Sequence, residues 1–500
     1  MLKKRITILL LALILLLTLS LSCCGQPNLN KVSKDLDNYS VSATFDDKNM
    51  VLSAVQVVEF TNRGQVTVDC VKFHIYANAY SQDNCSSVVM QDDRLSAYYN
   101  GYSYGSISFD SVSVNNETCA YIIEGDNEDI LNIPLRTPLA SNKSVKITMV
   151  YEVNLANIRH RLGYGDNTVN FGNCFPILCV LCEGAYRCHS YTPIGDPFLS
   201  DVANYQVSLT VPSTYQVAHT GSLTDKSQKD ALTTYLVNAL AVREFAFVLS
   251  QSFTTLCGEH SNGTNSYMYY NDPSAQSTLE LITEAVAYFS KLFCQYPYPN
   301  LSVVQTDLCY GGMEYPALVM VAVIDDVAQY RHTVVHEIAH QWLYALVGND
   351  QINDAWMDEG LVEFVTAMFF DNHPQYELTM DSIMSSNYAN YAVYIDVKTS
   401  FAKDVDTSMN RSIYEYSNWQ EYAYINYVKG CIMFYEIYKT MGNVKFNKAL
   451  NRYVSQYGFA IATSADMIEC FSLVQGSDLN SLFKAYLLGE DVLARAPKTP

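Results

Sequence analysis

The sequence predicts an α+β protein of more than one domain, in which an antiparallel, sandwich-like β domain precedes a mixed α/β domain that is mostly helical. Alternation of apolar and polar residues, typical of strands with one buried face, extends from about Asn38 to Ser252. The polar stretch 257–266 interrupts this pattern, and from residue 277 onward apolar residues recur at helical spacing. The chain has 500 residues, 49% of them hydrophobic, which is enough for two large cores.

Residues 1–24 are predicted to be an export signal. Three basic residues precede an apolar run from Ile6 to Leu17. Leu21-Ser22-Cys23-Cys24 then resembles a bacterial lipobox, in which a cysteine becomes the lipidated N-terminus. We therefore expect an exported lipoprotein, anchored to the membrane at the cell surface. Simple secretion and a retained N-terminal helix are the alternatives, and the sequence leaves open whether Cys23 or Cys24 is lipidated.

Residues 30–253 are predicted to form the β domain. Clusters of Asn, Asp, Gly and Ser separate its short strands, as in antiparallel sandwiches. The clearest alternating segments are 51–60, 66–75, 145–153 and 205–211.

Residues 254–495 are predicted to form the second domain, with 257–266 as a boundary loop. A helix over 277–293 ends at Tyr296-Pro297-Tyr298-Pro299, and a strand over 301–306 follows. The next helix is expected from about 327 to 346, and Asn353 or Asp354 can cap the one after it. Further helices are expected at 427–441, 444–456 and 479–488.

Charge and cysteine content narrow the range of partners. A net charge of −20 argues against nucleic acid as a partner, because phosphate binding requires a basic surface.

Two of the 14 cysteines belong to the export signal, and an exported chain permits disulfides among the other twelve. Cys179 and Cys182 could form half of a zinc knuckle. Since no second C-x2-C pair exists, disulfides or free thiols are favoured, with the pairing open.

One motif carries the chemistry. His336-Glu337-Ile338-Ala339-His340 places two imidazoles one helical turn apart, so both can bind one metal ion. Eighteen residues separate the second histidine from Glu359, which can supply a third ligand and leaves the fourth position of a tetrahedral zinc ion open for water. Glu337 can then take a proton from the zinc-bound water. The sequence predicts a zinc hydrolase with one Zn²⁺ per chain.

Two further motifs give the chain a family resemblance. Gly311-Gly312-Met313-Glu314-Tyr315 precedes the zinc motif, and Tyr427-Val428-Lys429-Gly430 follows it. In order and spacing these motifs resemble the zinc metallopeptidases typified by aminopeptidase N and leukotriene A4 hydrolase. The resemblance implies a β domain followed by a thermolysin-like peptidase domain, and an aminopeptidase that removes the N-terminal residue of peptides.

The resemblance also implies roles for individual residues. Glu314 would bind the free α-amine of the substrate, within a substrate-binding loop that includes Gly311, Gly312 and Met313. A carboxylate suits this task because it binds an ammonium group by charge-assisted hydrogen bonds. Tyr427 would stabilise the oxyanion of the tetrahedral intermediate. Tyr315 replaces the more frequent Asn, which bears on the contact with the substrate backbone.

Three nearby residues have less definite roles. Glu363 lies on the same helical face as Glu359, where it either accepts a hydrogen bond from a zinc-bound histidine or is simply solvated. His332 is expected to be a packing or surface residue, because three protein ligands suffice for zinc. Asp358 receives no role.

Two other functions stay open at this stage: a thermolysin-type endopeptidase, and an inactive peptidase fold that binds partners at the surface. An intact Glu314 argues against the first, and the presence of Glu337 and Tyr427 argues against the second. The preferred first residue, the natural substrate and the oligomeric state do not follow from the sequence.

Overall fold

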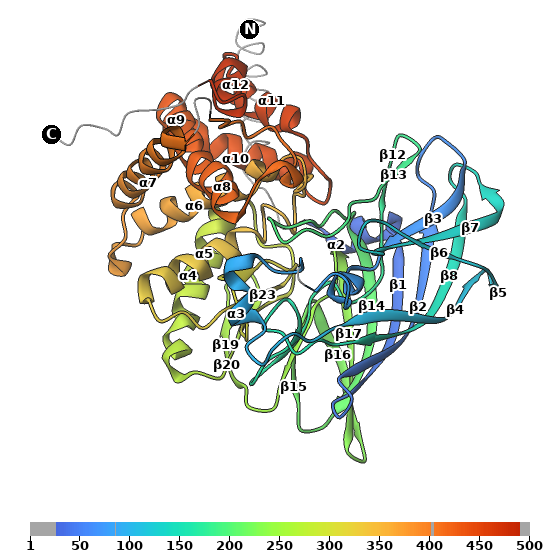
Figure 1. Cartoon of the computed structure of the whole chain (residues 1–500). Helices are drawn as coiled ribbons and strands as arrows, with labels where there is room; N and C mark the ends of the chain where they lie inside the picture. The colour runs from blue at the N-terminus through green and yellow to red at the C-terminus, as the bar shows by residue number, and fades with distance from the viewer. Residues whose placement is uncertain (1–26, 86, 402–404, 491–500) are drawn as a thin grey trace, which may run out of the picture.

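The computed structural model describes residues 27–85, 87–401 and 405–490, shown in Figure 1 as coloured ribbon. The predicted export signal lies outside these ranges. Within them, none of the helices combines the length and the apolar character needed to cross a membrane.

The largest element of the N-terminal domain is an eight-stranded sheet. Its strands lie in the order β16 (Ser222–Lys229), β17 (Leu232–Val242), β14 (Ala203–Pro212), β1 (Asn38–Asp46), β2 (Val51–Thr61), β8 (Ser144–Asn154), β4 (Ser106–Val114) and β5 (Glu117–Thr118). Alternate residues of β1 are buried, as the period-two sequence pattern requires. The expected antiparallel arrangement has one exception, because β1 and β14 run parallel.

Two smaller sheets complete this β-rich domain. One contains β15 (Gln216–His219), β18 (Phe247–Ser250), β10 (Val169–Phe171) and β9 (Leu162–Tyr164); the other contains β11 (Ile177–Leu178), β3 (Val68–His74), β7 (Ile130–Leu139) and β6 (Ile122–Glu124). A separate hairpin, β12 (Val180–Cys182) with β13 (Ala185–Arg187), extends from the chain after β11. Short helices α2 (Leu29–Val32) and α3 (Arg94–Ala97) lie outside the sheets.

The second domain contains one five-stranded mixed sheet. Its order is β19 (Thr254–Glu259), β20 (Asn265–Tyr270), β21 (Asn300–Gln305), β23 (Leu318–Val321) and β22 (Gly312–Met313). The central strand β21 is almost wholly buried, in keeping with its parallel neighbours on both sides. The prediction of a loop at 257–266 was wrong: the segment belongs mostly to a hairpin, and only 260–264 form its turn.

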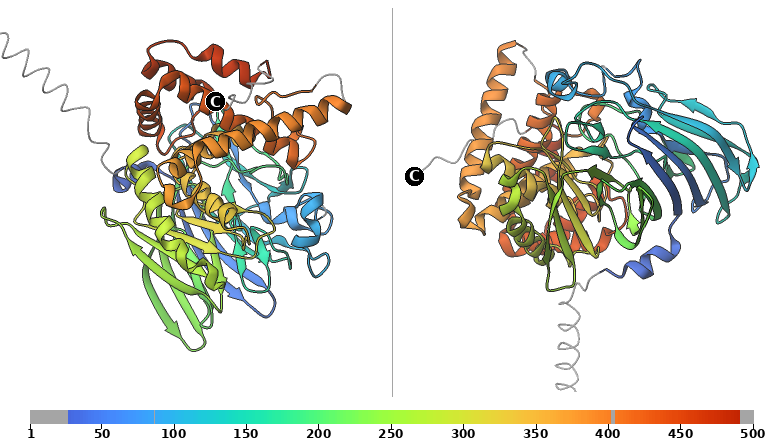
Figure 2. Two further views of the ribbon diagram at one scale, coloured as in Figure 1. Left: turned by 90° about the vertical axis from the view of Figure 1, so that its left-hand side faces the viewer. Right: turned by 90° about the horizontal axis from the view of Figure 1, so that it is seen from below.

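Helices make up most of this domain and occupy the left and upper part of Figure 1. They are α4 (Thr278–Leu292), α5 (Val327–Ala339), α6 (Glu359–Asp371), α7 (Met380–Phe401), α8 (Trp419–Tyr422), a π-helical segment (Ala423–Lys429), α9 (Gly430–Met441), α10 (Asn443–Tyr457), α11 (Ser464–Gln475) and α12 (Asn480–Leu487). Figure 2 shows the two domains side by side, with α7 at the outer side of the helical domain. The α+β fold class with a β-rich N-terminal half is confirmed; α7 and α11 were not anticipated.

The helix that carries the two histidines is shorter than predicted. It ends at Ala339, with His340 as its C-terminal cap, instead of continuing to residue 346. Beyond this cap the α-helical hydrogen-bond pattern is lost: the Ala345 amide donates to the His340 carbonyl and the Val347 amide to the Trp342 carbonyl, and Tyr344 has a φ of 150°. The predicted cap of the next helix was also wrong. Asp358, rather than Asn353 or Asp354, caps α6 by accepting a hydrogen bond from the Glu359 amide.

Arg243, between β17 and β18, joins the two domains. Its guanidinium is buried and donates to the carbonyls of Ser200, Tyr344 and Ala460 at 2.7–2.8 Å. The next residue, Glu244, accepts a hydrogen bond from the Tyr344 hydroxyl at 2.6 Å. A buried cation with this many backbone acceptors cannot be removed without leaving carbonyls unpaired.

We expect Arg243→Met to lower the free energy of unfolding by about 3–5 kcal/mol, because it leaves three buried carbonyls without donors and Glu244 without a neighbouring cation. Denaturant unfolding monitored by circular dichroism measures this. Arg136→Met is the control, since Arg136 forms an exposed ion pair with Glu117 that contributes less than about 1 kcal/mol. Equal effects of the two substitutions would contradict the role given to Arg243.

Candidate metal centre and active site

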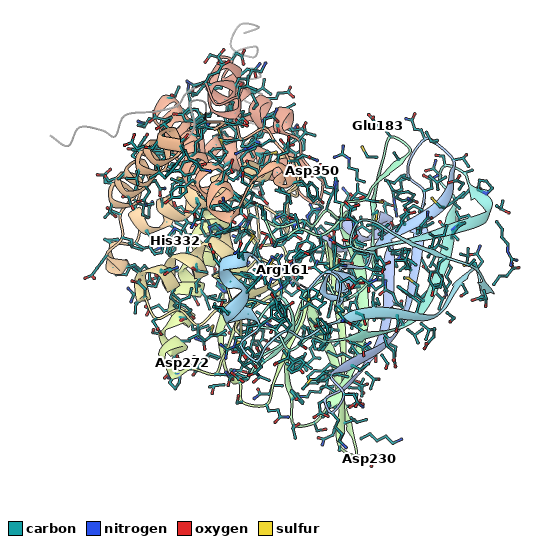
Figure 3. The ribbon with its side chains drawn as sticks, viewed as in Figure 1. Arg161, Glu183, Asp230, Asp272, His332 and Asp350 are labelled. Carbon is teal, nitrogen blue, oxygen red and sulfur yellow. The ribbon has the colours of Figure 1, made fainter. Side chains whose placement is uncertain are left out.

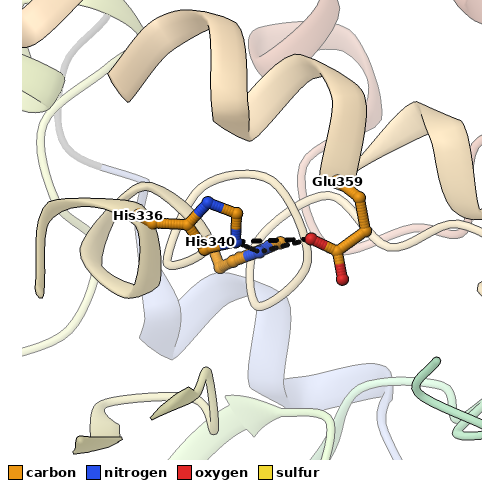
Figure 4. Close-up of side chains that lie close together, drawn as sticks. All are labelled: His336, His340 and Glu359. Carbon is orange, nitrogen blue, oxygen red and sulfur yellow. Dashed lines mark hydrogen bonds and ion pairs between the residues drawn. The ribbon is translucent and has the colours of Figure 1, made fainter. Parts of the chain in front are cut away.

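His336, His340 and Glu359 meet at the contact between α5 and α6, as Figure 4 shows. The two histidines lie one turn apart at the end of α5, and Glu359 is the first residue of α6. The His336 and His340 Nε2 atoms are 3.1 Å apart, and Glu359 Oε2 lies 3.3 and 3.4 Å from them. All three side chains are buried.

These three atoms fit a tetrahedral zinc ion. Ligands about 2.0–2.1 Å from zinc at tetrahedral angles lie about 3.3 Å from one another, which agrees with the observed spacing. Within the described residues, the neighbours that hold the buried Glu359 Oε2 are the two histidines themselves, so a cation bound between the three side chains displaces no other partner. Two imidazole nitrogens and one carboxylate oxygen are the donor types of catalytic zinc sites, which keep one position open.

Each imidazole has a partner at its Nδ1 atom, which keeps the Nε2 atom directed toward the metal centre. His340 Nδ1 lies 3.0 Å from the Leu343 carbonyl, which fixes the proton on Nδ1. His336 Nδ1 lies 3.0 Å from Glu363 Oε1, and the other oxygen of Glu363 lies 3.5 Å from His332 Nε2. Of the two alternatives for Glu363, the geometry therefore matches the carboxylate that orients a metal-binding histidine. His332 contacts that carboxylate and not the metal centre.

The pKa values of these three side chains are shifted in the directions that favour their charged forms. Burial opposes the protonated imidazoles, but the Glu359 carboxylate outweighs it and raises the pKa of His340 to about 10. The pKa of His336 is also raised, by Glu359 and Glu363 against the effect of burial. Conversely, burial opposes ionised Glu359, yet hydrogen bonds from both histidines lower its pKa to about 2. The centre therefore favours positive charge between these three side chains.

Glu337 lies beside the metal centre, over the Gly311-Gly312 loop. Burial raises the pKa of Glu337 to about 7, although the two histidines oppose this shift. A carboxyl group with such a pKa can both accept and release a proton near neutral pH. Gly312 leaves the space for it, because a Cβ there would lie 2.5 Å from Glu337 Oε1. At Gly311, a Cβ would meet Thr333 at an ordinary 3.5 Å.

Glu314 is buried next to the same centre. Its Oε1 accepts a hydrogen bond from the Gln351 amide at 3.2 Å. Burial raises the pKa of Glu314 well above its usual value, and the carboxylates of Asp196, Glu337 and Glu359 add to this effect. A cation arriving beside Glu314 would relieve this repulsion.

Tyr427 reaches the centre from the π-helical segment. Its hydroxyl donates to Glu359 Oε1 at 2.6 Å, and its ring stacks on His336 with centroids 5.9 Å apart. Single π turns inside α-helices are frequent at functional sites. Here the π segment begins after α8 and ends where α9 starts, so the wider turn presents Tyr427 to α6.

Two glycines of the sequence motifs explain how these helices approach each other. A Cβ on Gly360 would lie 2.8 Å from the Gly430 Cα, and the reverse holds for Gly430. Only two glycines permit this contact between α6 and α9. Lys429, between Tyr427 and Gly430 in the motif, is buried and donates to the carbonyls of Thr407 and Tyr486 at 2.5 and 2.7 Å. The motif residues thus set the helix contact that positions Glu359 and Tyr427.

Asp358 and Tyr315 have structural roles that could not be read from the sequence. Asp358 caps α6 and accepts hydrogen bonds from Asn349 and Gln351, and the Gln351 amide also donates to Glu314. Tyr315 donates to Asn173 Oδ1 at 2.6 Å, across the domain boundary. Since a Cβ at Gly172 would lie 2.1 Å from the Tyr315 hydroxyl, Gly172 makes room for the tyrosine that replaces Asn.

A cavity of about 510 Å³ opens onto the centre and is lined from both domains. The second domain contributes Gly311, Gly312, His336, Glu337, Glu363 and Tyr427, among others. From the β domain come Arg161 and Asp196, paired at 2.6 Å; Arg161 is labelled in Figure 3. Neither residue could be predicted from the sequence, because both lie outside every motif and no spacing connects them to the metal helix. Met313 is buried, and Arg161 Nη1 lies 3.3 Å from its sulfur.

A β domain, a mixed sheet flanked by helices and a His-His-Glu donor set define a zinc metallopeptidase type of architecture. Residues 277–486, within the second domain, match the model of the "Peptidase family M1 domain".

Relatives and solved structures agree with this assignment. Over 322 residues the chain is 23% identical to mitochondrial aminopeptidase 2 of Saccharomyces cerevisiae, covering 59% of this chain and 31% of the relative. Alanine/arginine aminopeptidase of the same yeast is 22% identical, with 59% and 34% covered. The chain therefore spans about a third of the length of these relatives. An M1 zinc metallopeptidase from Deinococcus radiodurans shares the fold, with a TM-score of 0.64 at 13% identity, covering 96% of this chain and all of that structure.

We expect His340→Ala to reduce bound zinc from about one ion per chain to near none after dialysis, because it removes one of three ligands. Inductively coupled plasma mass spectrometry measures the metal content. His332→Ala is the matched control on the same helix and should keep nearly all the zinc, since His332 contacts Glu363 alone among the site's carboxylates. Full zinc content in His340→Ala, or equal loss in both variants, would contradict the assigned ligand set.

Proposed function

We propose that this chain is a zinc aminopeptidase that hydrolyses the first peptide bond of peptides with a free N-terminus. The observation that carries the proposal is Glu314, a buried carboxylate next to the metal centre whose pKa is raised by burial and by other carboxylates. A substrate ammonium group supplies the cation that this position lacks. The names of the yeast relatives, both aminopeptidases, support the same activity.

Zinc bound by His336, His340 and Glu359 would polarise the scissile carbonyl and acidify a water molecule. Glu337 would accept the proton of the attacking water and deliver it to the leaving amine, for which a pKa of about 7 is suited. The Tyr427 hydroxyl, now 2.6 Å from Glu359 Oε1, would donate to the oxyanion as charge develops.

The Gly311–Met313 loop supports placement of the peptide backbone. β22 (Gly312–Met313) is the edge strand of the five-stranded sheet, and among the described residues it pairs with β23 alone. Its outer edge carries backbone groups to which an extended peptide could add as a further strand. With the amine held at Glu314, such pairing would place the first peptide bond at the metal centre, so the cut falls after one residue.

The decisive test compares aminoacyl fluorogenic amides with a free α-amine against the same amides N-acetylated, on the zinc-loaded chain. Cleavage confined to free amines is expected. Glu314→Gln, which keeps the shape but not the charge, should raise KM for free-amine substrates by at least about tenfold through the lost ammonium contact. Cleavage of both substrate sets would indicate an endopeptidase. Cleavage of neither, with zinc bound, would indicate a non-catalytic binding protein.

We expect Gly312→Ala to lower kcat by at least about 100-fold while zinc stays bound, because the added methyl displaces the Glu337 carboxylate. Gly311→Ala is the neighbouring control and should retain most of the activity, since its methyl meets only an ordinary contact with Thr333. Glu337→Gln sets the level of activity without the general base. Full activity in Gly312→Ala would contradict the claim that turnover requires the Glu337 carboxylate at its observed position.

A further inference from the structure

The hairpin β12–β13 places two cysteines opposite each other. Its register pairs Cys182 with Ala185, Leu181 with Tyr186 and Val180 with Arg187. The next pair outward along the two chains is Cys179 and Cys188. Glu183 and Gly184, which form the turn, have φ of 51° and 84°, as a two-residue type I′ turn requires. A tight turn of this kind sets the register of the residues that follow it.

The position of this pair in the ladder suits a disulfide. In an antiparallel hairpin the pair beside a two-residue turn is hydrogen-bonded, and the two kinds of pair then alternate. Counting outward from Cys182 and Ala185, the pair of Cys179 and Cys188 is non-hydrogen-bonded. Such pairs have Cα atoms about 4.5 Å apart, inside the range of about 4.4–6.8 Å that a disulfide bridges.

The surroundings differ for the two thiols. Cys179 is buried, and its amide donates to the Lys72 carbonyl of β3 at 2.9 Å, so its backbone is anchored to the sheet. Burial raises the pKa of Cys179, while a hydrogen bond from the Cys179 thiol lowers the pKa of Cys188, helped by the Lys72 ammonium group. The half-buried Cys188 is therefore the more reactive thiol, with its partner in contact.

The same hairpin touches the loop that supports the amine site. Arg187, next to Cys188, forms an ion pair with Asp350 at 2.9 Å. The following residue, Gln351, donates to both Glu314 and Asp358. Figure 3 labels Glu183 at the tip of the hairpin and Asp350 on the side of the helical domain. The base of the hairpin thus lies where the β domain meets the loop beside Glu314.

We propose that Cys179 and Cys188, free thiols in this structure, form a reversible cross-strand disulfide that braces this hairpin between the two domains. The Cys188 thiolate attacks one sulfur of a disulfide-bearing oxidant and expels one oxidant thiolate. The Cys179 thiol loses its proton and attacks the Cys188 sulfur of the mixed disulfide, expelling the second oxidant thiolate. Two protein thiols are oxidised, the oxidant disulfide is reduced, and its two thiolates take up the two protons.

Peptide mapping tests the bond directly. The full chain is equilibrated with oxidised and reduced glutathione, quenched with acid, alkylated and digested with trypsin. Cleavage after Arg187 separates peptide 162–187 from peptide 188–226, so the disulfide appears as a linked pair of peptides. We expect the linked pair to dominate at high oxidised glutathione and to vanish with excess dithiothreitol.

Single substitutions assign the bond. The linked pair should be absent from Cys179→Ser and Cys188→Ser but present in Cys182→Ser, the control in the same hairpin, whose sulfur accepts from Arg187 Nη2 at 3.7 Å. Persistence of the link in Cys179→Ser would mean that another cysteine pairs with Cys188 and would overturn the proposal. So would complete alkylation of both cysteines at every glutathione ratio.

Thermal unfolding tests the bracing role. Oxidation should raise the unfolding midpoint by a few degrees in the wild type and in Cys182→Ser but not in Cys188→Ser, because the bond shortens the free loop of the unfolded chain. Equal midpoints for oxidised and reduced wild type would refute a bracing role. These outcomes need no peptidase activity, so they stand or fall separately from the proposed function.

Discussion

Repulsion between buried carboxylates is the constraint on which the centre of this molecule depends. Glu314, Glu337 and Glu359 are buried close enough that the latter two raise the pKa of Glu314, and Glu363 lies behind His336. Several negative charges in such a site are tolerable only where positive charge is supplied. Between Glu359 and the two histidines that charge is a metal ion or imidazole protons. Beside Glu314 no side chain of the described residues forms an ion pair, and under the proposed function a substrate ammonium group would supply the missing positive charge.

The helix contacts follow from the need to bring these groups together. Glu359 can face the histidines because α6 starts at that residue, capped by Asp358. Tyr427 can reach Glu359 because Gly360 and Gly430 let α6 and α9 approach with no side chain between them. The two glycines and the cap contribute no chemistry to the reaction, yet without them the ligand and the phenol would stand too far apart.

Much of this arrangement could be predicted from the sequence, since it depends on local periodicity and short motifs. Strands with alternating burial, such as β2, and helices with regular apolar spacing, such as α4, follow from local pattern alone. The ligand set follows from a spacing that one helix turn and one following helix impose. The predictions that failed concern segments held by tertiary partners: after the early end of α5, Arg243 from the other domain binds the Tyr344 carbonyl, and Asn349 and Gln351 donate to Asp358, the cap of α6. Arg161 and Asp196 could not be found, because only the folded chain brings them to the cavity.

The β domain is therefore part of the site and not merely an attachment to it. Asp196 contributes to the raised pKa of both Glu314 and Glu337, and its partner Arg161 lies against Met313 of the Gly311–Met313 loop. Tyr315 of that loop is held by Asn173, and Arg243 ties the end of the metal helix to the sheets. The peptidase family domain spans 277–486, but the electrostatics of its cleft include charges from residues 161 and 196. Two segments far apart in sequence thus share one acidic site, where burial is the main cause of the raised pKa of Glu314 and Glu337 and Asp196 from the other domain adds to it.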